Sequence, residues 1–160
     1  MTRAFCICVA LAISSSTACA APADNACVSV LTADVAQRVL GAAVEPGIRN
    51  SVTDQTMGTS VISRCSYSLK GVMRGATVSL MLTRAGTADE AKTNFTSSKA
   101  TYKGQDVAGL GDAAFRTAMP AQLNVLKGRD WLIIAAGTFP KGDAALQQKA
   151  AVEILKNLHD

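Results

Sequence analysis

The stretch Ser63-Arg64-Cys65-Ser66-Tyr67-Ser68-Leu69 decides the fold of this 160-residue chain. Its cysteine, tyrosine and leucine alternate with arginine and serine, as on a β-strand that buries one of its faces. Its cysteine also has few possible partners in the rest of the chain. We therefore take this strand as the anchor of the fold and work outward from it.

Residues 1–20 have the composition of an export signal. A single positive charge, at Arg3, precedes an apolar run of about ten residues and then a segment of small side chains. The apolar run is shorter than the roughly 20 residues that a transmembrane helix needs. Ala18-Cys19-Ala20 places small side chains at the positions that a signal peptidase reads. We predict a signal peptide that is cleaved after Ala20 and a periplasmic or secreted mature protein.

Two other interpretations of this leader are open. Cys19 could be the lipid-modified residue of a lipoprotein, although Ser16 stands where such signals usually have leucine. The leader could instead be a buried N-terminal helix, but no amphipathic segment follows it. We expect contact with a membrane only if Cys19 carries a lipid.

The remaining residues, 21–160, have the length of a single domain with its own core. Of the five cysteines in the chain, Cys27 and Cys65 are the two that stay after the leader is removed. An even number of cysteines in an oxidising compartment favours a disulfide. We predict a bridge between Cys27 and Cys65, with two buried free thiols as the alternative.

The charge balance gives little indication of a partner. The formal net charge of +4 includes Arg3 of the leader, and the Lys and Arg residues are scattered along the chain. A charge of this size affects solubility more than the choice of partner. We expect no nucleic-acid partner, because neither the charge pattern nor an exported location suits one.

Hydrophobic periodicity predicts three helices. They cover residues 31–41, residues 88 to about 102, and a final segment that follows Asp143. Thr32, Thr87 and Asp143 are suitable N-caps, and Gly41 is a suitable C-terminal stop. Residues 21–26 have no helical pattern and read as a short lead-in.

Alternating patterns predict five strands. They are residues 62–69, 77–84, 115–119, 122–127 and 131–137. Residues 133–136 are apolar on both faces, which places the last strand in the centre of the sheet. The order α-ββ-α-βββ-α lacks the βαβ alternation of parallel sheets. It therefore predicts an α+β fold with a single antiparallel sheet of about five strands packed by about three helices.

The segment before the first predicted strand is polar and irregular. Glu45-Pro46-Gly47 reads as a turn, and residues 48–60 read as a long loop, with or without an edge strand. Loops of this length in a small domain often carry function. This loop is therefore one position where a site could lie.

No group of residues predicts catalysis, metal binding or a cofactor. His159 is the single histidine and lies near the chain end, so a nucleophile has no base beside it. One histidine and the absence of a CxxC spacing leave zinc unsupported, and scattered methionines fill cores more often than they bind copper. Residues 109–114 match G-x-G-x-x-A, but a strand rather than a helix follows them. We interpret this motif as a glycine turn, not a dinucleotide site.

Tyr67 and Trp131 are the notable aromatic residues in an aromatic-poor chain. Either side chain could line an apolar pocket, and packing in the core is the alternative for each. We take both as candidate groove residues for a ligand. The groove would lie between the sheet and a helix, with residues 48–60 at its rim.

Three short motifs resemble small exported domains of mycobacterial cell-envelope lipoproteins and the related sensor domain of a mycobacterial Ser/Thr kinase. They are Cys27-Val-Ser-Val-Leu31-Thr32-Ala-Asp34-Val35 with Leu40-Gly41 after it, Cys65-Ser-Tyr67, and Val107-Ala-Gly-Leu-Gly-Asp-Ala-Ala114. The resemblance implies an antiparallel sheet between helices, akin to the PsbP-like fold, and a disulfide that joins the first helix region to the sheet. These families have no agreed enzymatic activity, so the resemblance implies no catalytic residues.

These observations favour a non-catalytic exported or periplasmic module of the cell envelope, which binds a small apolar ligand or a protein partner. An enzyme is the alternative from another class, in the form of a hydrolase that uses Asp or Glu, because the twelve acids could converge in space. A structural or inhibitory protein that acts through an exposed apolar patch is a third hypothesis.

Overall fold

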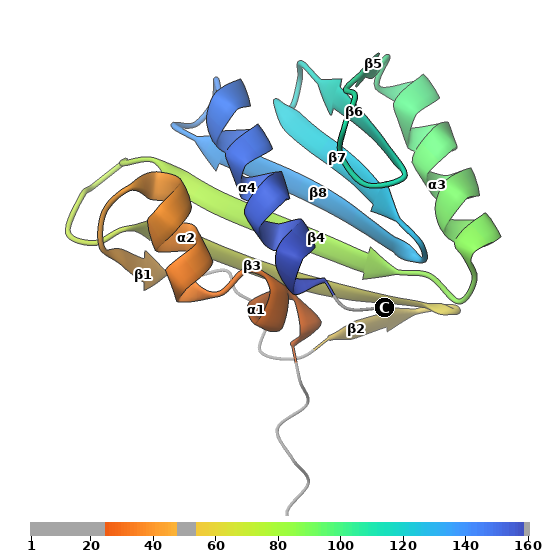
Figure 1. Ribbon diagram of the computed structural model, residues 1–160, viewed down its shortest axis with the longest axis horizontal. Coiled ribbons are helices and arrows are strands. Elements are labelled where there is room, and N and C mark those ends of the chain that lie inside the picture. The colour runs from red at the N-terminus through yellow and green to blue at the C-terminus, as the bar shows by residue number, and fades with distance from the viewer. Residues whose placement is uncertain (1–24, 48–53, 159–160) are drawn as a thin grey trace, which may run out of the picture.

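A computed structural model describes residues 25–47 and 54–158. The predictions about the leader, Cys19 and His159 lie outside these residues, as does the first part of the 48–60 loop. In the part that is described, helices and one antiparallel sheet form an α+β fold (Figure 1). The predicted fold class is therefore confirmed.

The described chain contains four helices and eight strands. The helices are α1 (Ala26–Val30), α2 (Ala33–Leu40), α3 (Ala88–Thr101) and α4 (Ala144–Asn157). The strands are β1 (Val44–Pro46), β2 (Gln55–Met57), β3 (Ser60–Leu69), β4 (Thr77–Arg84), β5 (Gln105–Asp106), β6 (Ala113–Thr117), β7 (Gln122–Lys127) and β8 (Asp130–Gly137). The sheet order is β1-β3-β4-β8-β7-β6-β5, and β2 also pairs with β3.

The prediction of about five strands and three helices is too low because the missed elements are short. β1, β2, β5 and α1 have between two and five residues, which is too few to show a period. Glu45-Pro46-Gly47 was predicted as a turn, and this is wrong, since Val44–Pro46 pair with the end of β3. Pro46 is tolerated there because β1 is an edge strand. The central position predicted for β8 is confirmed, since β8 lies between β4 and β7.

Local capping chemistry places the ends of the long helices where the sequence predicted them. The Thr32 hydroxyl accepts from the Val35 N–H (3.2 Å), and the Thr87 hydroxyl accepts from the Glu90 N–H (3.1 Å). Gly41 ends α2 with a φ of 77°, a left-handed conformation that glycine adopts without steric cost.

Helices lie on both sides of the sheet. The covered face, which carries Cys65, Val78, Leu80 and Ile134, packs against α1, α2 and α4 in the main core. The opposite face, here called the open face, carries Ser66, Ser79, Met81 and Ile133. At one end of the open face α3 packs through Phe95, whose ring meets Phe115 at 4.7 Å and Trp131 at 6.4 Å between centroids. The rest of the open face has no helix of the described chain over it.

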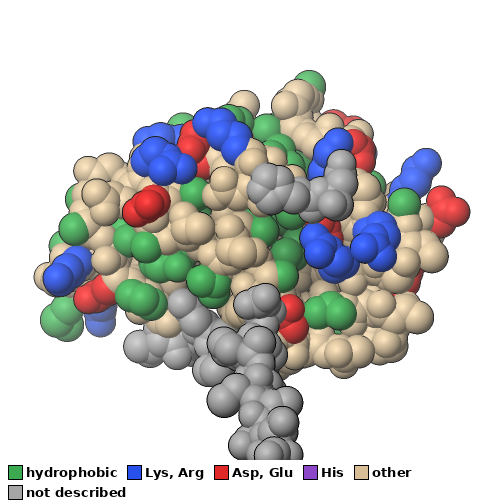
Figure 2. Space-filling view, turned by 60° about the horizontal axis from the view of Figure 1, so that its bottom comes forward, with side chains coloured by type: hydrophobic (Ala, Val, Ile, Leu, Met, Phe, Trp, Pro, Cys, Tyr) green, Lys and Arg blue, Asp and Glu red, His purple; other side chains and the backbone are tan. Residues whose placement is uncertain are grey.

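The surface of the described chain carries dispersed charge. Lys and Arg side chains are interspersed with Asp and Glu on the face that Figure 2 shows, and no continuous basic stripe crosses it. Several of these charges pair, for example Arg38 and Lys156 with Glu153. Across residues 25–47 and 54–158, the helices lack the length and apolar character that a membrane-spanning helix needs.

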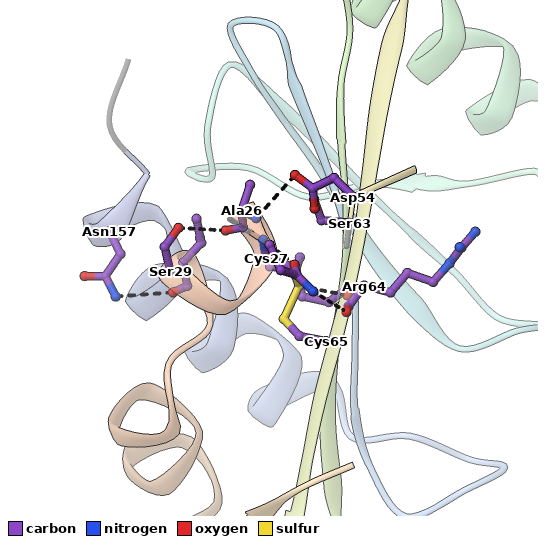
Figure 3. The surroundings of a disulfide bond; sticks show 11 residues. Ala26, Cys27, Ser29, Asp54, Ser63, Arg64, Cys65 and Asn157 are labelled. Atoms are coloured by element: carbon purple, nitrogen blue, oxygen red, sulfur yellow. Dashed lines mark hydrogen bonds between the residues drawn. A yellow bond between two sulfur atoms is a disulfide. The ribbon is translucent and has the colours of Figure 1, made fainter. Parts of the chain in front are cut away.

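The predicted disulfide is present and holds α1 on the sheet (Figure 3). Cys27 and Cys65 are buried, with 5.7 Å between their Cα atoms. Asp54 reinforces the contact, because its carboxylate accepts from the Ala26 N–H (3.5 Å) and from the Ser63 hydroxyl. α1 is thus joined covalently and by hydrogen bonds to the strand that anchors the fold.

Glu90 ties the start of α3 to the start of β3. Its carboxylate accepts hydrogen bonds from the Thr59 hydroxyl (2.9 Å), the Ser60 hydroxyl (3.1 Å) and the Gly86 N–H (3.0 Å). Hydrogen bonds to the charged form lower the pKa of Glu90 below its ordinary value of 4.5, and the Thr59 hydroxyl is the largest cause.

This arrangement predicts an acid-sensitive contribution from Glu90. Because the pKa is lower in the folded chain, the contribution is complete above the ordinary value of 4.5 and is lost as the pH falls through the folded pKa. We expect the gap in melting temperature between the wild type and Glu90→Gln to be widest near neutral pH and to close in acid. Thermal unfolding followed by circular dichroism across this range measures the gap.

Asp89→Asn is the matched control for this experiment. Asp89 precedes Glu90 in the first turn of α3, but its carboxylate has no hydrogen bond or ion pair within the described residues. Its variant should show a smaller pH-dependent gap. A gap for Glu90→Gln that stays constant from neutral pH into acid would contradict the role given to these hydrogen bonds.

Candidate functional site

The part of the open face that α3 leaves uncovered is hollowed. The hollow has a volume of about 560 Å³, within the range of about 300–1,000 Å³ typical of small-molecule sites. Strands β3, β4, β8 and β7 form its floor, and α3 and the turn between β6 and β7 form its walls. The side chains that line it are Arg64, Ser66, Ser79, Met81, Ser98, Tyr102, Thr117, Pro120, Gln122, Asn124, Trp131, Ile133 and Ala135.

Strand register brings the floor residues together. Met81 on β4 lies opposite Ile133 on β8, and Ile133 lies opposite Asn124 on β7. Ser79 pairs with Ala135 in the same way. Met81, Ile133 and Ala135 are only half-buried although they stand on central strands. The floor therefore offers apolar surface that the rest of the described chain does not cover.

A hydrogen bond fixes Trp131 at one end of the hollow. The indole Nε1 donates to Asn124 Oδ1 at 3.1 Å, and the ring packs edge-on against Phe95. Asn124 itself is 2 % exposed, and its Nδ2 donates to no group within the described residues. The polar edge of the indole is thus used inside the protein, while the amide of Asn124 keeps a donor at the floor.

The hollow carries a single kind of charge. Arg64 is the charged residue that lines it, and its Nη1 donates to Gln55 Oε1 at 3.0 Å. None of the described residues that line the hollow is an acid. A pair of carboxylates for hydrolysis is therefore lacking among these lining residues, and the hollow is suited to ligands that are neutral or carry a negative group.

Acids gather instead beside the start of α3. Asp89, Asp106 and Asp112 line a second cavity of about 420 Å³ together with Lys92 and Lys99. Lys99 pairs with Asp106. The Gly128 N–H donates to Asp112 at 2.7 Å and is the largest cause that lowers the pKa of this carboxyl. A general acid at neutral pH needs a raised pKa. The lowered pKa of Asp112 therefore does not favour the hydrolase hypothesis.

The two predicted groove residues lie on different faces of the sheet. Trp131 lines the hollow. Tyr67 lies on the covered face, where it is 5 % exposed and where burial raises the pKa of its hydroxyl. Of the two candidate groove residues, Trp131 therefore lines the hollow, and Tyr67 takes the packing in the core that was its alternative. Side chains two positions apart share a face of a strand, so Tyr67 follows Cys65 toward α1 and into the main core.

The described part of the predicted rim does not line the hollow. Within the 48–60 segment, residues 54–60 are described, and none of them lines the hollow. Residues 48–53 lie outside the described part. The floor residues Met81, Ile133 and Asn124 were missed. Ile133 could have been found from the sequence, because the run of apolar residues at 133–136 leaves apolar side chains on both faces of β8.

Neither metal-binding geometry nor likeness to known proteins adds a second candidate site among the described residues. Within residues 25–47 and 54–158, no three Cys, His, Asp or Glu side chains group in a way that could hold a metal ion. No protein-family model, curated protein or solved structure matches this chain. The geometry of the hollow therefore carries the functional argument.

Proposed function

We propose that this chain is a non-catalytic binding module of the cell envelope and that it holds a small, largely apolar ligand in the hollow of the open face. The observation that supports this function is the apolar floor of Met81, Ile133 and Ala135, which stays only partly buried at the centre of the sheet. Large apolar side chains on central strands are normally covered, and an uncovered apolar hollow is typical of a binding site.

The cell-envelope location rests on the sequence. The export-signal composition of residues 1–20 supports passage out of the cytoplasm, and the resemblance to mycobacterial envelope lipoproteins supports a role there. A ligand in the hollow would place its apolar part on the floor. Its polar groups would meet the Asn124 amide and the Tyr102 hydroxyl, both of which line the hollow.

Trp131 makes this function directly testable. It is the single tryptophan of the chain, so all tryptophan fluorescence comes from the hollow. We expect the neutral apolar dye N-phenyl-1-naphthylamine to bind saturably and to quench this emission by energy transfer. Replacing Ile133 with Glu should weaken binding by about tenfold or more, because the ligand would have to desolvate a carboxylate on the floor.

Val152→Glu is the matched control. Val152 lies on α4 with 44 % exposure and lines no part of the hollow. This variant should bind the dye as the wild type does, and the unfolding temperature of both variants should be compared before binding is measured. Non-saturable quenching of the wild type, or equal affinity for a folded Ile133→Glu variant, would refute the proposed site.

A further inference from the structure

Three turns each present an exposed apolar side chain at one end of the sheet. The turns are residues 70–76 between β3 and β4, 118–121 between β6 and β7, and 138–142 between β8 and α4. Met73 and Phe139 are 93 % exposed and Met119 is 88 % exposed, more than any other large apolar side chain of the described chain. We call these three side chains the apolar tip.

The strand pairing brings these turns together. Thr77 pairs with Gly137, so the first and third turns meet where β4 begins and β8 ends (Figure 1). From the start of α4, Gln147 Nε2 donates to the Ala121 carbonyl at 3.0 Å, which holds the second turn against the third. The three turns therefore lie at one end of the sheet.

Basic residues lie on two of the three turns. Lys70 and Arg74 on the first turn and Lys141 on the third are exposed, and none of the ion pairs of the described chain involves them. The three turns contain no Asp or Glu. The acids close to them are Asp143, whose carboxylate accepts from backbone N–H groups at the start of α4, and Glu45 on β1. Exposed apolar groups among cations are suited to an anionic lipid surface.

We propose that this end of the molecule docks on an anionic membrane surface, with the apolar tip among the headgroups and the three basic residues near lipid phosphates. An exposure near 90 % means that each apolar side chain touches little else, its neighbours on the tip included. Separate projecting groups suit a fluid lipid interface better than the flat, closely packed core of a protein interface. The contact needs neither a lipid on Cys19 nor a ligand in the hollow.

Flotation with lipid vesicles tests this inference on the purified chain. We expect it to float with vesicles of equal parts phosphatidylcholine and phosphatidylglycerol, and to float much less with phosphatidylcholine alone. Binding should weaken as salt rises from about 0.1 M to about 1 M, because the Debye length falls from about 10 Å to about 3 Å. The triple variant Met73→Ser, Met119→Ser, Phe139→Ser should bind at least about tenfold less.

Two further variants separate the contribution of the basic residues from that of the apolar tip. The first is a triple variant in which the charges are removed, and it should lose the preference for phosphatidylglycerol; its changes are Lys70→Gln, Arg74→Gln and Lys141→Gln. The second is a control that removes exposed apolar side chains elsewhere, Met57→Ser with Val152→Ser, and it should bind like the wild type. All variants should first show the wild-type unfolding midpoint. Absence of flotation for the wild type, or equal flotation for the folded tip variant, would overturn the inference. A wild-type dimer that the tip variant abolishes, with no vesicle binding, would assign the tip to contact between copies instead.

Discussion

Replacing Cys27 and Cys65 together by alanine should lower the free energy of unfolding by about 4 kcal/mol, the largest single effect that we expect in this chain. The bridge closes a loop with a sequence separation of 38, and the chain-entropy relation gives about 4 kcal/mol for a loop of this length. For a domain of this size that loss corresponds to a fall in melting temperature of roughly 10–20 °C.

Loss of the bridge should also destabilise α1 locally. α1 has five residues, and an isolated helix shorter than about 12 residues is not stable in water. Without the bridge, α1 is held by the packing of Val30 in the core and by three hydrogen bonds. Ala26 N–H donates to Asp54, Asn25 Nδ2 donates to the Arg64 carbonyl at 3.3 Å, and the Asn157 side chain donates to the Val30 carbonyl at 3.2 Å. We expect amide exchange in α1 to increase more than exchange in β4 or β8.

Reduction provides the control for this experiment. Full reduction of the wild type should bring its melting temperature close to that of the double variant, and the same reductant should leave the variant unchanged. Titration of free thiols verifies that reduction is complete. An unchanged melting temperature for the fully reduced wild type would contradict a stabilising role for the bridge.

Gly111→Ala should destabilise the chain by about 3 kcal/mol, which is clearly more than the same change at Gly109. Both glycines have positive φ, 55° at Gly111 and 80° at Gly109, and alanine in this conformation costs about 1–2 kcal/mol. A Cβ at Gly109 would meet no atom within 4 Å. A Cβ at Gly111 would lie 2.3 Å from the Leu126 carbonyl oxygen, and this overlap adds about 1–3 kcal/mol.

The backbone around Gly111 cannot move away without losing other contacts. The Asp112 N–H donates to the same Leu126 carbonyl at 2.7 Å, and the Asp112 carboxylate accepts from the Gly128 N–H. A shift that relieves the overlap would lengthen both hydrogen bonds. Midpoints of urea unfolding for the two variants measure the difference. Equal midpoints would show that the left-handed conformation, and not the close approach, decides the requirement for glycine.

The glycine motif shows how far sequence reasoning reached. It identified residues 109–114 as a turn into a strand, and the structure confirms this with β6 at Ala113–Thr117. The reason for glycine at position 111 depends on Leu126, which lies on β7 and has no recognisable relation to the motif along the chain. The local conformation could therefore be predicted, but the neighbour that makes it necessary could not.

The candidate site shows the same limit. Trp131 was identified as a residue that could line a pocket, and it does line the hollow. Tyr67 was the other candidate, but its alternation with Cys65 sends it to the covered face, where it packs in the core. The sequence pattern showed which residues share a strand face. It did not show that α3 crosses to the other side of the sheet from α1, α2 and α4.

By itself, the sequence determined the α+β class, the three long helices with their caps, the main hairpin and the pairing of Cys27 with Cys65. These features depend on interactions within a few residues, or on the small number of cysteines. The tertiary structure alone decided the edge strands, the side of the sheet that each helix covers, the hollow beside Trp131 and the meeting of three apolar turns. Those features arise from contacts between residues far apart in the chain, which no local pattern encodes.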